Sequence, residues 1–441
     1  MKQYTEYKKS EVPFLDFVPK EWRIIRLRYL GDLNAGGVDK KIVENEPLFK
    51  SVHYMNVYSE SLHNIYDSDE YLVVSATKQK QSSCSLLTGD VLFTSSSETP
   101  EDIGHSCVVG ENLNNTLFGY HLMRFRPSVN LTLAFEKYLF GVYYIRKWFA
   151  YRAVGMTRYG ISNNDFSDAR VLLPPIQAQQ RIADYLDRKI AVLDSVISDK
   201  QKLIELLQEK RIALICQTVT KGLDRSVPMK GSGVAWLGDI PKHWQVRTNH
   251  QVFAERNVKS TQQDDVLLSV TKYLGVILQS QAEELNLATI APAETTEGYK
   301  LVRKGDLVMN IMRAKDGSYG ISPYDGVISP AYCIYYTREK ANSQYLFYLF
   351  KTPMYIEIFK NFSTGIAEHR MRLYPVSFFK IPVVIPPFAE QDKIVEHLDK
   401  RTKAIDDLIG LTQHQIEKLK EYRQSVISEA VTGKVATEYA N

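Results

Sequence analysis

The second half of this chain restates the first, and a repeat of this length constrains the fold more than any other feature of the sequence. The stretch LPPIQAQQRIADYLD at Leu173–Asp187 returns as IPPFAEQDKIVEHLD at Ile385–Asp399, 212 residues later in a chain of 441. A single hydrophobic core rarely extends beyond roughly 250–300 residues. The repeat therefore predicts two domains built on one scaffold.

Further matched segments follow in the same order in both halves, while the residues between them hardly match. This pattern indicates an old duplication followed by changes in the connecting loops. Simple drift of the loops would explain the contrast, and so would two modules that recognise different ligands. The matched pairs are 10–22 with 232–244, Gly89–Leu92 with Gly305–Val308, and Tyr138–Phe140 with Tyr345–Phe347.

Each Pro-Pro pair is followed by a helical pattern with heptad-like spacing. Proline fixes the backbone ahead of a helix start, and apolar residues 4, 3, 4, 7 and 3 positions apart form a coiled-coil seam. Lys200 and Thr412 interrupt the two seams at the same level. Each helix covers about 40 residues, or roughly 60 Å. We expect the two helices to pair antiparallel; parallel pairing in a homodimer is the alternative. The seam residues are Leu186, Ile190, Leu193, Ile197, Ile204 and Leu207 in the first helix and Leu398, Ile405, Ile409, Ile416 and Leu419 in the second.

The segments that precede the helices alternate like strands and are rich in turns. GDVLFT at Gly89–Thr94 and GDLVMN at Gly305–Asn310 each predict a tight turn followed by a buried strand. The predicted fold is α+β: two duplicated mixed α/β modules joined by a pair of long antiparallel coiled-coil helices, with internal pseudo-twofold symmetry. The expected domains are a module at 1–173, a helix at 174–222, a module at 223–385 and a helix at 386–441.

Basic and hydrogen-bonding residues gather at two places in each module: the loop after the Gly-Asp strand and the segment before the Pro-Pro pair. Arginine suits guanine edges and phosphate oxygens, and hydroxyl and amide side chains can contact bases or phosphates. Any one of these residues alone could equally lie in a solvated loop. The candidates for DNA binding are Thr94, Ser95, Arg152, Thr157, Arg158 and Tyr159 in the first module and Asn310, Arg313, Lys315, His369, Arg370 and Arg372 in the second.

No motif for catalysis or metal binding is found. The sequence has no phosphate-binding G-x-x-x-x-G-K-[ST] loop, no His pair at metal-ligand spacing, and four cysteines without a C-x-x-C pair. Asp306 and Lys315 could belong to a nuclease site, but a supporting acidic residue at short spacing is missing. The net charge of +4 permits contact with DNA without requiring it. The absence of a long apolar run argues against a signal peptide or membrane span.

Taken together, these motifs resemble the specificity subunits of type I restriction-modification enzymes over essentially the whole chain. The resemblance is carried by the S-x-V-x-x-L…[VI]-P-x-x-W openings, by the Gly-Asp-x-[LV] turns and by the two LPP/IPP-x-x-x-Q-x-x-I-x-x-[YH]-L-D helices. One difference between the copies is Phe14 in the first opening, where the second has Trp236.

The resemblance implies a target-recognition domain in each module, each reading one half of an asymmetric, bipartite site in double-stranded DNA. It implies that the helices set the gap between the half-sites and dock two modification (methyltransferase) subunits. Those partners would use S-adenosylmethionine to methylate adenine, and restriction (motor-nuclease) subunits, which use ATP and Mg²⁺, would join for cleavage. The chain itself would be cytoplasmic, non-catalytic and free of cofactors.

Two other functions remain open at this stage. One is a coiled-coil scaffold that binds proteins and has no DNA specificity. The other is a nuclease whose site lacks a recognisable motif. Salt-dependent binding to gapped DNA would separate the first of these from a DNA reader, because phosphate contacts weaken steeply with salt.

Overall fold

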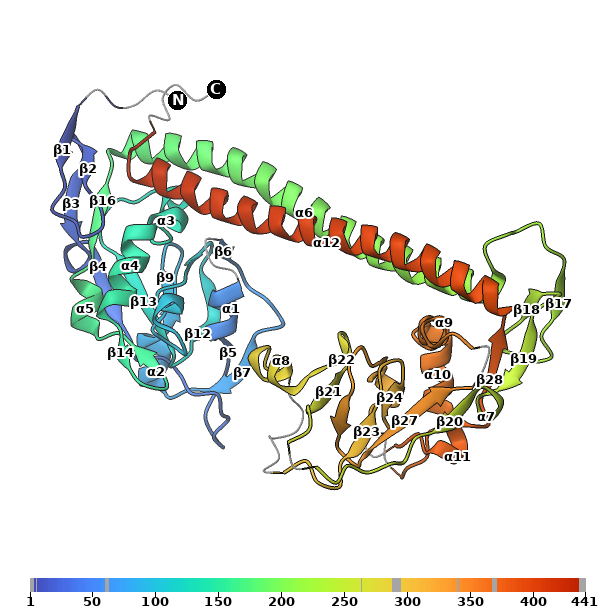
Figure 1. Cartoon of the computed structure of the whole chain (residues 1–441). Helices are drawn as coiled ribbons and strands as arrows, with labels where there is room; N and C mark the ends of the chain where they lie inside the picture. Colours follow the sequence, from blue (N-terminus) through green and yellow to red (C-terminus); the bar gives the residue numbers. More distant parts are fainter. Residues whose placement is uncertain are drawn as a thin grey trace. The chain divides into compact units, whose positions relative to one another are not determined.

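The computed structural model describes residues 4, 6–59, 63–262, 264–287, 295–338, 341–366 and 371–435 (Figure 1). The chain divides into two compact units, one made of residues 1–201 and 414–441 and the other of residues 202–413. Each unit holds one module and parts of the two long helices, α6 (Ile176–Lys221) and α12 (Phe388–Val431). The predicted α+β fold is confirmed, and the unit boundaries cut through both helices.

The two long helices start in the same way, which explains the glutamine shared by the two repeat motifs. The buried side chain of Gln179 donates to the carbonyl of Pro174 at 3.0 Å and accepts from the backbone of Thr132 at 3.0 Å. Gln391 repeats both bonds, to Pro386 at 2.9 Å and from Asn342 at 2.8 Å. Each glutamine therefore ties the start of a helix to the module that precedes it.

Within each unit α6 and α12 run antiparallel. In the first unit Arg423 Nε lies 2.9 Å from Asp194 Oδ1, and in the second Arg211 Nε lies 2.8 Å from Asp406 Oδ1. In both ion pairs the residue numbers add up to 617, which one constant antiparallel register requires. The helices have 46 and 44 residues, longer than the 40 expected. At 1.5 Å per residue they are about 69 and 66 Å long.

The seam between the helices is apolar with a polar break. The side chain of Lys200 donates to Gln415 Oε1 at 2.7 Å, whereas the buried hydroxyl of Thr412 donates to the carbonyl of Leu408 at 2.8 Å. The polar residue that interrupts the seam is therefore bonded to the other helix in the first copy and to its own helix in the second. The other seam residues are buried at Leu186, Ile190, Ile204, Leu207, Leu398 and Ile416 and half-buried at Leu193, Ile197, Ile405, Ile409 and Leu419.

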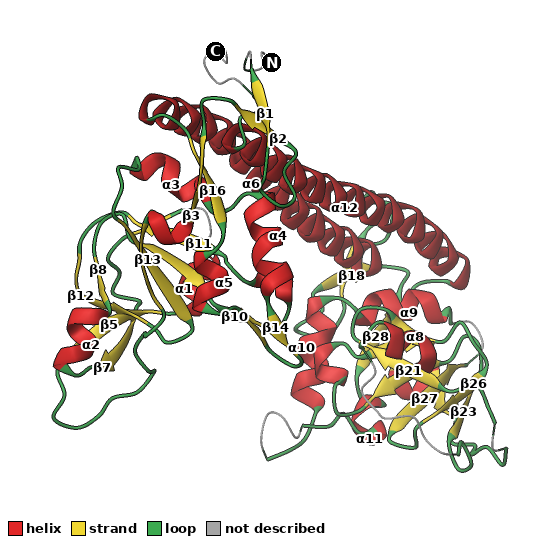
Figure 2. Ribbon diagram, turned by 90° about the vertical axis from the view of Figure 1, so that its left-hand side faces the viewer, coloured by secondary structure: helices red, strands yellow, loops and turns green. Residues whose placement is uncertain are grey.

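The first module is built on antiparallel-rich sheets with short helices packed against them (Figure 2). Its central sheet has the order β4-β13-β9-β11-β6, a second sheet has the order β7-β5-β12-β8, and a small third sheet is β10-β15-β14. Two-stranded sheets β1-β2 and β16-β3 complete it. The strands are β1 (Tyr7–Lys9), β2 (Phe17–Pro19), β3 (Arg23–Arg26), β4 (Gly31–Asn34), β5 (Leu48–Val52), β6 (Asn64–Ile65), β7 (Leu72–Ser75), β8 (Ser85–Leu86), β9 (Val91–Thr94), β10 (Ser96–Ser97), β11 (Ser106–Val109), β12 (Leu113–Phe118), β13 (Leu122–Pro127), β14 (Val154–Gly155), β15 (Tyr159–Gly160) and β16 (Arg170–Leu173). The helices are η1 (Leu27–Tyr29), α1 (Tyr54–Ser59), α2 (Lys78–Ser83), η2 (Pro100–Asp102), α3 (Leu133–Leu139), α4 (Tyr143–Arg152) and α5 (Asn163–Ser167).

The second module repeats the same scaffold in fewer residues. Its central sheet has the order β20-β27-β24-β25, accompanied by the pairs β17-β18, β19-β28, β21-β22 and β23-β26. The strands are β17 (Met229–Gly231), β18 (Asp239–Pro241), β19 (Gln245–Thr248), β20 (Phe253–Glu255), β21 (Leu268–Thr271), β22 (Gly275–Leu278), β23 (Lys300–Val302), β24 (Leu307–Asn310), β25 (Tyr319–Ile321), β26 (Gly326–Ile328), β27 (Tyr332–Thr337) and β28 (Pro382–Ile385). The helices are α7 (Asn249–Val252), α8 (Gln279–Glu284), η3 (Ala314–Asp316), α9 (Ser343–Phe350), α10 (Pro353–Phe362) and α11 (Pro375–Phe378).

The core of each unit includes the end of one long helix and the start of the other. In the first unit Val426, Ile427 and Val431 of α12 share a core cluster with Leu186 of α6 and with Trp22. In the second unit Ile215 and Val219 of α6 share a cluster with Leu398 of α12 and with Trp244. Each module is therefore packed against helical residues from both repeats.

The glycine that ends each helix lies against the tryptophan of the opening motif. A Cβ on Gly433 would lie 2.3 Å from Pro19 and 3.1 Å from Trp22, and one on Gly222 would lie 3.2 Å from Trp244. Both glycines have positive φ, 73° and 78°, which favours glycine sterically. In each unit the tryptophan of the opening motif therefore contacts the glycine that ends a long helix.

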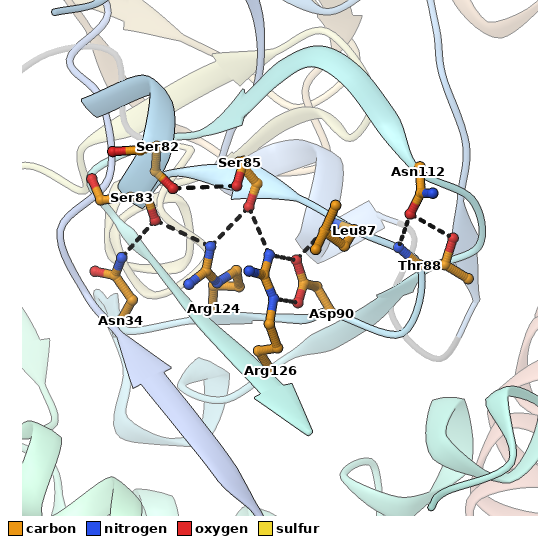
Figure 3. Close-up of polar contacts among 10 residues, drawn as sticks. All are labelled: Asn34, Ser82, Ser83, Ser85, Leu87, Thr88, Asp90, Asn112, Arg124 and Arg126. Carbon is orange, nitrogen blue, oxygen red and sulfur yellow. Dashed lines mark hydrogen bonds and ion pairs between the residues drawn. The ribbon is translucent and has the colours of Figure 1, made fainter. Parts of the chain in front are cut away.

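The aspartate of each Gly-Asp turn has a structural role, and Figure 3 shows that of Asp90 in the first module. Asp90, at the start of β9, is buried and accepts from the backbone of Leu87 at 2.8 Å. Arg126 donates to both carboxylate oxygens of Asp90 at 2.6 Å. In the second unit Asp306 accepts from the backbone of Arg303 at 2.9 Å and from Arg256 at 2.7 and 3.1 Å. Arg126 lies in β13 whereas Arg256 directly follows β20, so the ion pair has been kept while its cationic partner has changed position.

One predicted alignment of the repeats is wrong. Tyr138 donates to Asp187 Oδ1 and Tyr348 donates to Asp399 Oδ1, each at 2.5 Å, so Tyr138 corresponds to Tyr348 rather than to Tyr345. The cause is the tandem sequence YLFYLF at 345–350, which allows two alignments three residues apart. Tyr345 instead donates to the carbonyls of Val219 and Val384 at 3.1 and 3.0 Å.

The corrected alignment identifies a buried carboxyl group that the second module lacks. Glu136 is 2% exposed, and its Oε1 has no hydrogen-bond partner among the described residues. Burial and the nearby Asp90 raise the pKa of Glu136 to about 8. Two residues before Tyr348, the second module has Leu346 at the corresponding place. An apolar side chain therefore occupies in one module the position that an acid occupies in the other.

Removing the turn carboxylate should destabilise its own module. We predict that Asp90→Ala or Asp306→Ala lowers the free energy of unfolding by about 2–4 kcal/mol, because an enclosed arginine and a backbone N–H lose their partner. Calorimetric unfolding would measure this. The control is Glu6→Ala, which breaks the exposed Lys20–Glu6 pair and should cost less than about 1 kcal/mol. Equal losses from Asp90→Ala and Glu6→Ala would contradict the structural role.

Removing the charge of Glu136 should stabilise the chain at alkaline pH. The folded chain holds this proton up to about pH 8, whereas an unfolded chain releases it near pH 4.5, so stability falls as the pH rises between these values. Glu136→Gln should match the wild type near pH 4.5 and exceed it by up to about 4 kcal/mol at pH 8. Denaturant unfolding at several pH values would test this, with Glu21→Gln on the exposed surface as the control. A gain that does not change with pH would exclude ionisation as its cause.

Candidate nucleic-acid interface

In the first module the two predicted loop regions meet in one small sheet. Strand β10 pairs antiparallel with β15, which places Ser96 opposite Gly160 and Ser97 opposite Tyr159. The carbonyl of Ser95 also accepts from the backbone of Ile161 at 3.2 Å. The loop after the Gly-Asp strand and the segment before the Pro-Pro pair therefore form a single surface region.

This surface region contains two residues that sequence reasoning missed, the cation Lys40 and the imidazole of His121. The hydroxyl of Ser95 donates to the carbonyl of His121 at 3.0 Å, and Ser96 Oγ lies 3.4 Å from His121 Nδ1. Burial, followed by the positive charges of Arg158 and Lys40, lowers the pKa of His121. Lys40, His121 and Arg158 thus lie close enough to interact electrostatically. Lys40 and His121 belong to no motif and are distant in sequence from Arg158, so no sequence signal would have found them.

A second feature of the first module is an aromatic group beside the η2 loop. Tyr54 and Tyr58 of α1 are stacked with ring centroids 5.7 Å apart, and Tyr58 lies 4.6 Å from the ring of His105. The hydroxyl of Tyr54 is 3.3 Å from Ser97 Oγ. Burial lowers the pKa of His105 to about 4, so this imidazole is neutral at physiological pH. The group offers flat rings and hydroxyls rather than positive charge.

The predicted residues of the first module divide into structural and exposed ones. Thr94 is fully buried, and its hydroxyl donates to the carbonyl of Asp102 at 3.1 Å and accepts from the backbone of His105 at 3.0 Å. Arg152 donates to Asp165 Oδ1 at 2.6 Å and lies over the ring of Trp148. Thr94 therefore closes the loop and Arg152 is held in an ion pair. Exposed or half-exposed positions are Ser95, Thr157, Arg158 and Tyr159.

In the second module the corresponding two regions are also joined. The backbone of Leu373 donates to the carbonyl of Ile311 at 2.9 Å, and Thr364 forms a β-bridge with Arg372. Arg313 and Arg372 are both exposed at this junction. His369 and Arg370 lie outside the described residues.

Two other predicted residues of the second module are less accessible. Asn310 is buried; its Oδ1 accepts from the backbone of Met312 at 3.1 Å and its amide is 3.4 Å from the hydroxyl of Tyr332. Lys315 is half-buried, with Nζ 3.7 Å from Asp316 Oδ1. Asn310 therefore shapes the start of the loop, and Arg313 is the exposed arginine of this loop.

The hairpin turn between β21 and β22 contributes further residues that the sequence did not identify. Tyr273 is 83% exposed, and the ammonium of Lys272 lies 5.3 Å from the centre of its ring. Lys351 Nζ donates to the carbonyl of Lys272 at 3.0 Å and to that of Gly317 at 2.7 Å. This turn is thereby attached to the loop that carries Arg313 and Lys315.

These arrangements present exposed cations, hydroxyls and aromatic rings, which can bind a polyanion. Among the described residues, no group of three or more His, Cys, Asp or Glu side chains could hold a metal ion. Asp306, considered above for a nuclease site, has its carboxylate bound by Arg256 and by a backbone N–H. In the same part of the chain no helix combines the length and the apolar character needed to cross a membrane.

Comparison with known proteins places both modules in one family. The model of the type I restriction modification DNA specificity domain matches the chain twice, at residues 19–206 and 241–421. The putative type I restriction enzyme MjaX specificity subunit of Methanocaldococcus jannaschii is 25% identical over 443 residues, covering 97% of this chain and 96% of that protein. The EcoDI specificity subunit of Escherichia coli is 21% identical over 65% of this chain and 66% of its own length.

Solved structures share the fold. The HsdS subunit from Thermoanaerobacter tengcongensis matches with a TM-score of 0.50 and 14% identity, over 97% of this chain and all of that one. A chain from a structural study of the assembly and conformational transition of the type I R-M system matches with a TM-score of 0.60 and 17% identity, over 95% and 99%. Because the family model matches most of the sequence in two consecutive copies, this chain belongs to the family of type I restriction modification DNA specificity subunits.

Proposed function

We propose that this chain reads an asymmetric, bipartite sequence in double-stranded DNA, with each module reading one half. The observation that carries the proposal is the pairing of one repeated scaffold with two unlike surfaces. The turn aspartate, the glutamine at the helix start and the tyrosine–aspartate bond occur twice. Between these repeated contacts, the first module presents Lys40, His121 and Arg158, whereas the second presents Lys272, Tyr273 and two arginines.

Unlike surfaces on like scaffolds suit a reader of two different half-sites. Cationic side chains contribute phosphate contacts, and hydroxyl, amide and arginine groups can distinguish base edges in the major groove. A protein-binding scaffold would need no exposed arginine in the segment before the Pro-Pro pair of both modules, where Arg158 and Arg372 lie. The half-sites should therefore differ in sequence, and the complete site should not be palindromic.

The long helices are suited to act as the spacer between the half-sites. Both are continuous, and ion pairs in one antiparallel register join them in each unit. A stiff connection turns two short readouts into one longer gapped readout, because binding of one module raises the effective concentration of the other. Rigidity of the pair is the property on which this role depends.

The outer surface of the helices carries exposed apolar side chains that suit the docking of partner subunits. Large apolar side chains remain exposed along both helices, and exposed apolar surface is a feature of protein interaction sites. We propose that two modification subunits bind there, supply S-adenosylmethionine and methylate adenine, and that restriction subunits, which use ATP and Mg²⁺, join them for cleavage in the cytoplasm. The exposed residues are Val192, Val196 and Tyr422 in the first unit and Leu203, Leu206, Ile212, Leu408 and Leu411 in the second.

DNA binding by the complex should be specific and strongly dependent on salt. The target can be found by mapping methylated adenines in a host that expresses the chain with its modification subunits. Binding of the purified complex to that site should weaken at least tenfold between 50 and 200 mM salt, because several phosphate contacts release counterions. Fluorescence anisotropy on the mapped duplex would measure this. A weak salt response with equal affinity for scrambled DNA would favour a protein-binding scaffold.

Shortening the helix pair should change the gap and leave both half-sites unchanged. Removing residues 200–206 together with 411–417 keeps the register, because paired positions still add up to a constant. The pair becomes about 10 Å shorter, which corresponds to roughly three base pairs. Methylation mapping should then show the original half-sites separated by a shorter gap. Altered half-sites with the original gap would exclude the helices as the spacer.

A further inference from the structure

A single lysine in the second module holds together the two loops that carry its exposed cations. Lys351 lies between α9 and α10, and its ammonium donates to the carbonyl of Gly317, at the end of η3, and to the carbonyl of Lys272, in the β21–β22 turn. The same ammonium lies 4.8 Å from the ring centre of Tyr319 and 5.3 Å from that of Phe347. Two carbonyls and two aromatic faces therefore enclose one positive charge.

The loops joined by Lys351 are also packed closely against neighbouring backbone. A Cβ on Gly320 would lie 2.8 Å from the Cα of Gly275, so the hairpin turn lies directly against β25. Gly317 has φ of 85°, a left-handed conformation that ends η3. Tyr319 donates its hydroxyl to the carbonyl of Phe350 at 2.6 Å. By binding one carbonyl of each loop, the Lys351 ammonium fixes the position of the η3 loop relative to the hairpin turn.

The first module has a corresponding contact made by a different residue. Arg146 of α4 donates to the carbonyl of Glu101 in η2, the short helix that follows the Gly-Asp strand. Asp102, Tyr58 and Tyr54 lie close enough to influence its charge electrostatically. Arg146 thus joins the η2 loop to α4, and the hydroxyl of Tyr58 in α1 lies 3.5 Å from Asp102 Oδ1 of the same loop. In both modules a cation in or just before the second helix, α4 or α10, holds the loop that follows the Gly-Asp strand.

We propose that Lys351 and Arg146 are positioning residues for sequence recognition, each fixing the loops of its own module and thereby the discrimination at one half-site. This inference rests on the proposed function, since it assumes that the loops contact DNA. Neither residue needs to touch a base. Displacing the loop that carries Arg313, or the turn that carries Lys272 and Tyr273, would weaken contacts with the bases more than attraction to the phosphates. Base contacts depend on precise geometry, whereas phosphate attraction is electrostatic.

The two positioning residues differ in how they respond to pH. Burial, followed by the charge of Lys272, lowers the pKa of Lys351 to about 8. Burial lowers the pKa of Arg146 only to about 10, which leaves it charged at physiological pH. Tyr319, which faces Lys351, stays protonated because burial raises its pKa. Above pH 8 the Lys351 ammonium loses its charge and its attraction to both rings, whereas the first module keeps its cation.

The test uses the complex of this chain with its modification subunits and three duplexes: the mapped site, and versions with the first or the second half-site scrambled. Discrimination at a half-site is the ratio of Kd values between scrambled and intact DNA. Lys351→Met should reduce discrimination at the second half-site by about tenfold, the size of one weakened base contact, and leave the first unchanged. Arg146→Met should do the reverse.

The pH profile separates positioning from a general loss of folding. Wild-type discrimination at the second half-site should fall between pH 7 and pH 9 while discrimination at the first stays constant. Lys351→Arg keeps the cation, so its discrimination at both half-sites should stay constant over this pH range. This variant also tests the inference if Lys351→Met fails to fold. The inference would be overturned if Lys351→Met affected both half-sites equally. It would also be overturned if Lys351→Arg lost discrimination at the second half-site between pH 7 and pH 9 as the wild type does. If the wild type discriminates at neither half-site, the proposed function fails instead.

Discussion

Each module of this chain is completed by a helix end that follows the other module in sequence. Trp22 of the first opening motif packs against Gly433, and Trp244 of the second packs against Gly222. These contacts bring the last turns of one helix into the core that already holds the first turns of the other. The antiparallel register follows from this arrangement, because a helix that starts at one module and ends at the other can satisfy both contacts only beside a partner running in the opposite direction.

The repeated contacts and the variable surfaces occupy different parts of each unit. Asp90 and Asp306 close the turn before the central strand, and Gln179 and Gln391 hold the helix starts. All four side chains are buried, so their hydrogen bonds specify the scaffold without reaching a ligand. The surfaces beyond them can vary because they are made by short strands, turns and exposed side chains whose replacement costs little stability.

The sequence predicted the elements that depend on local chemistry. The Pro-Pro pairs marked the helix starts, the glycines marked their ends, and the Gly-Asp turns preceded buried strands as expected. The prediction failed where the sequence allows two alignments of the repeats, at the tandem YLFYLF. The hydrogen bond from Tyr348 to Asp399 selects one of them. The sequence also could not identify Lys40 and His121 as neighbours of Arg158, because that proximity is created by the packing of distant segments. The same reason hid the buried roles of Thr94 and Asn310, which the sequence presents only as polar residues beside a loop.

The contact between Gly433 and Trp22 has a consequence for the order in which the chain can fold during synthesis. A ribosome finishes the first module long before it reaches the helical turns that enclose Trp22. Val426, Ile427 and Val431 emerge only after the whole second module, so the first module must wait with part of its apolar surface uncovered. The second unit, being continuous from 202 to 413, has all its residues sooner. Synthesis of the second module therefore precedes the step that completes the core of the first.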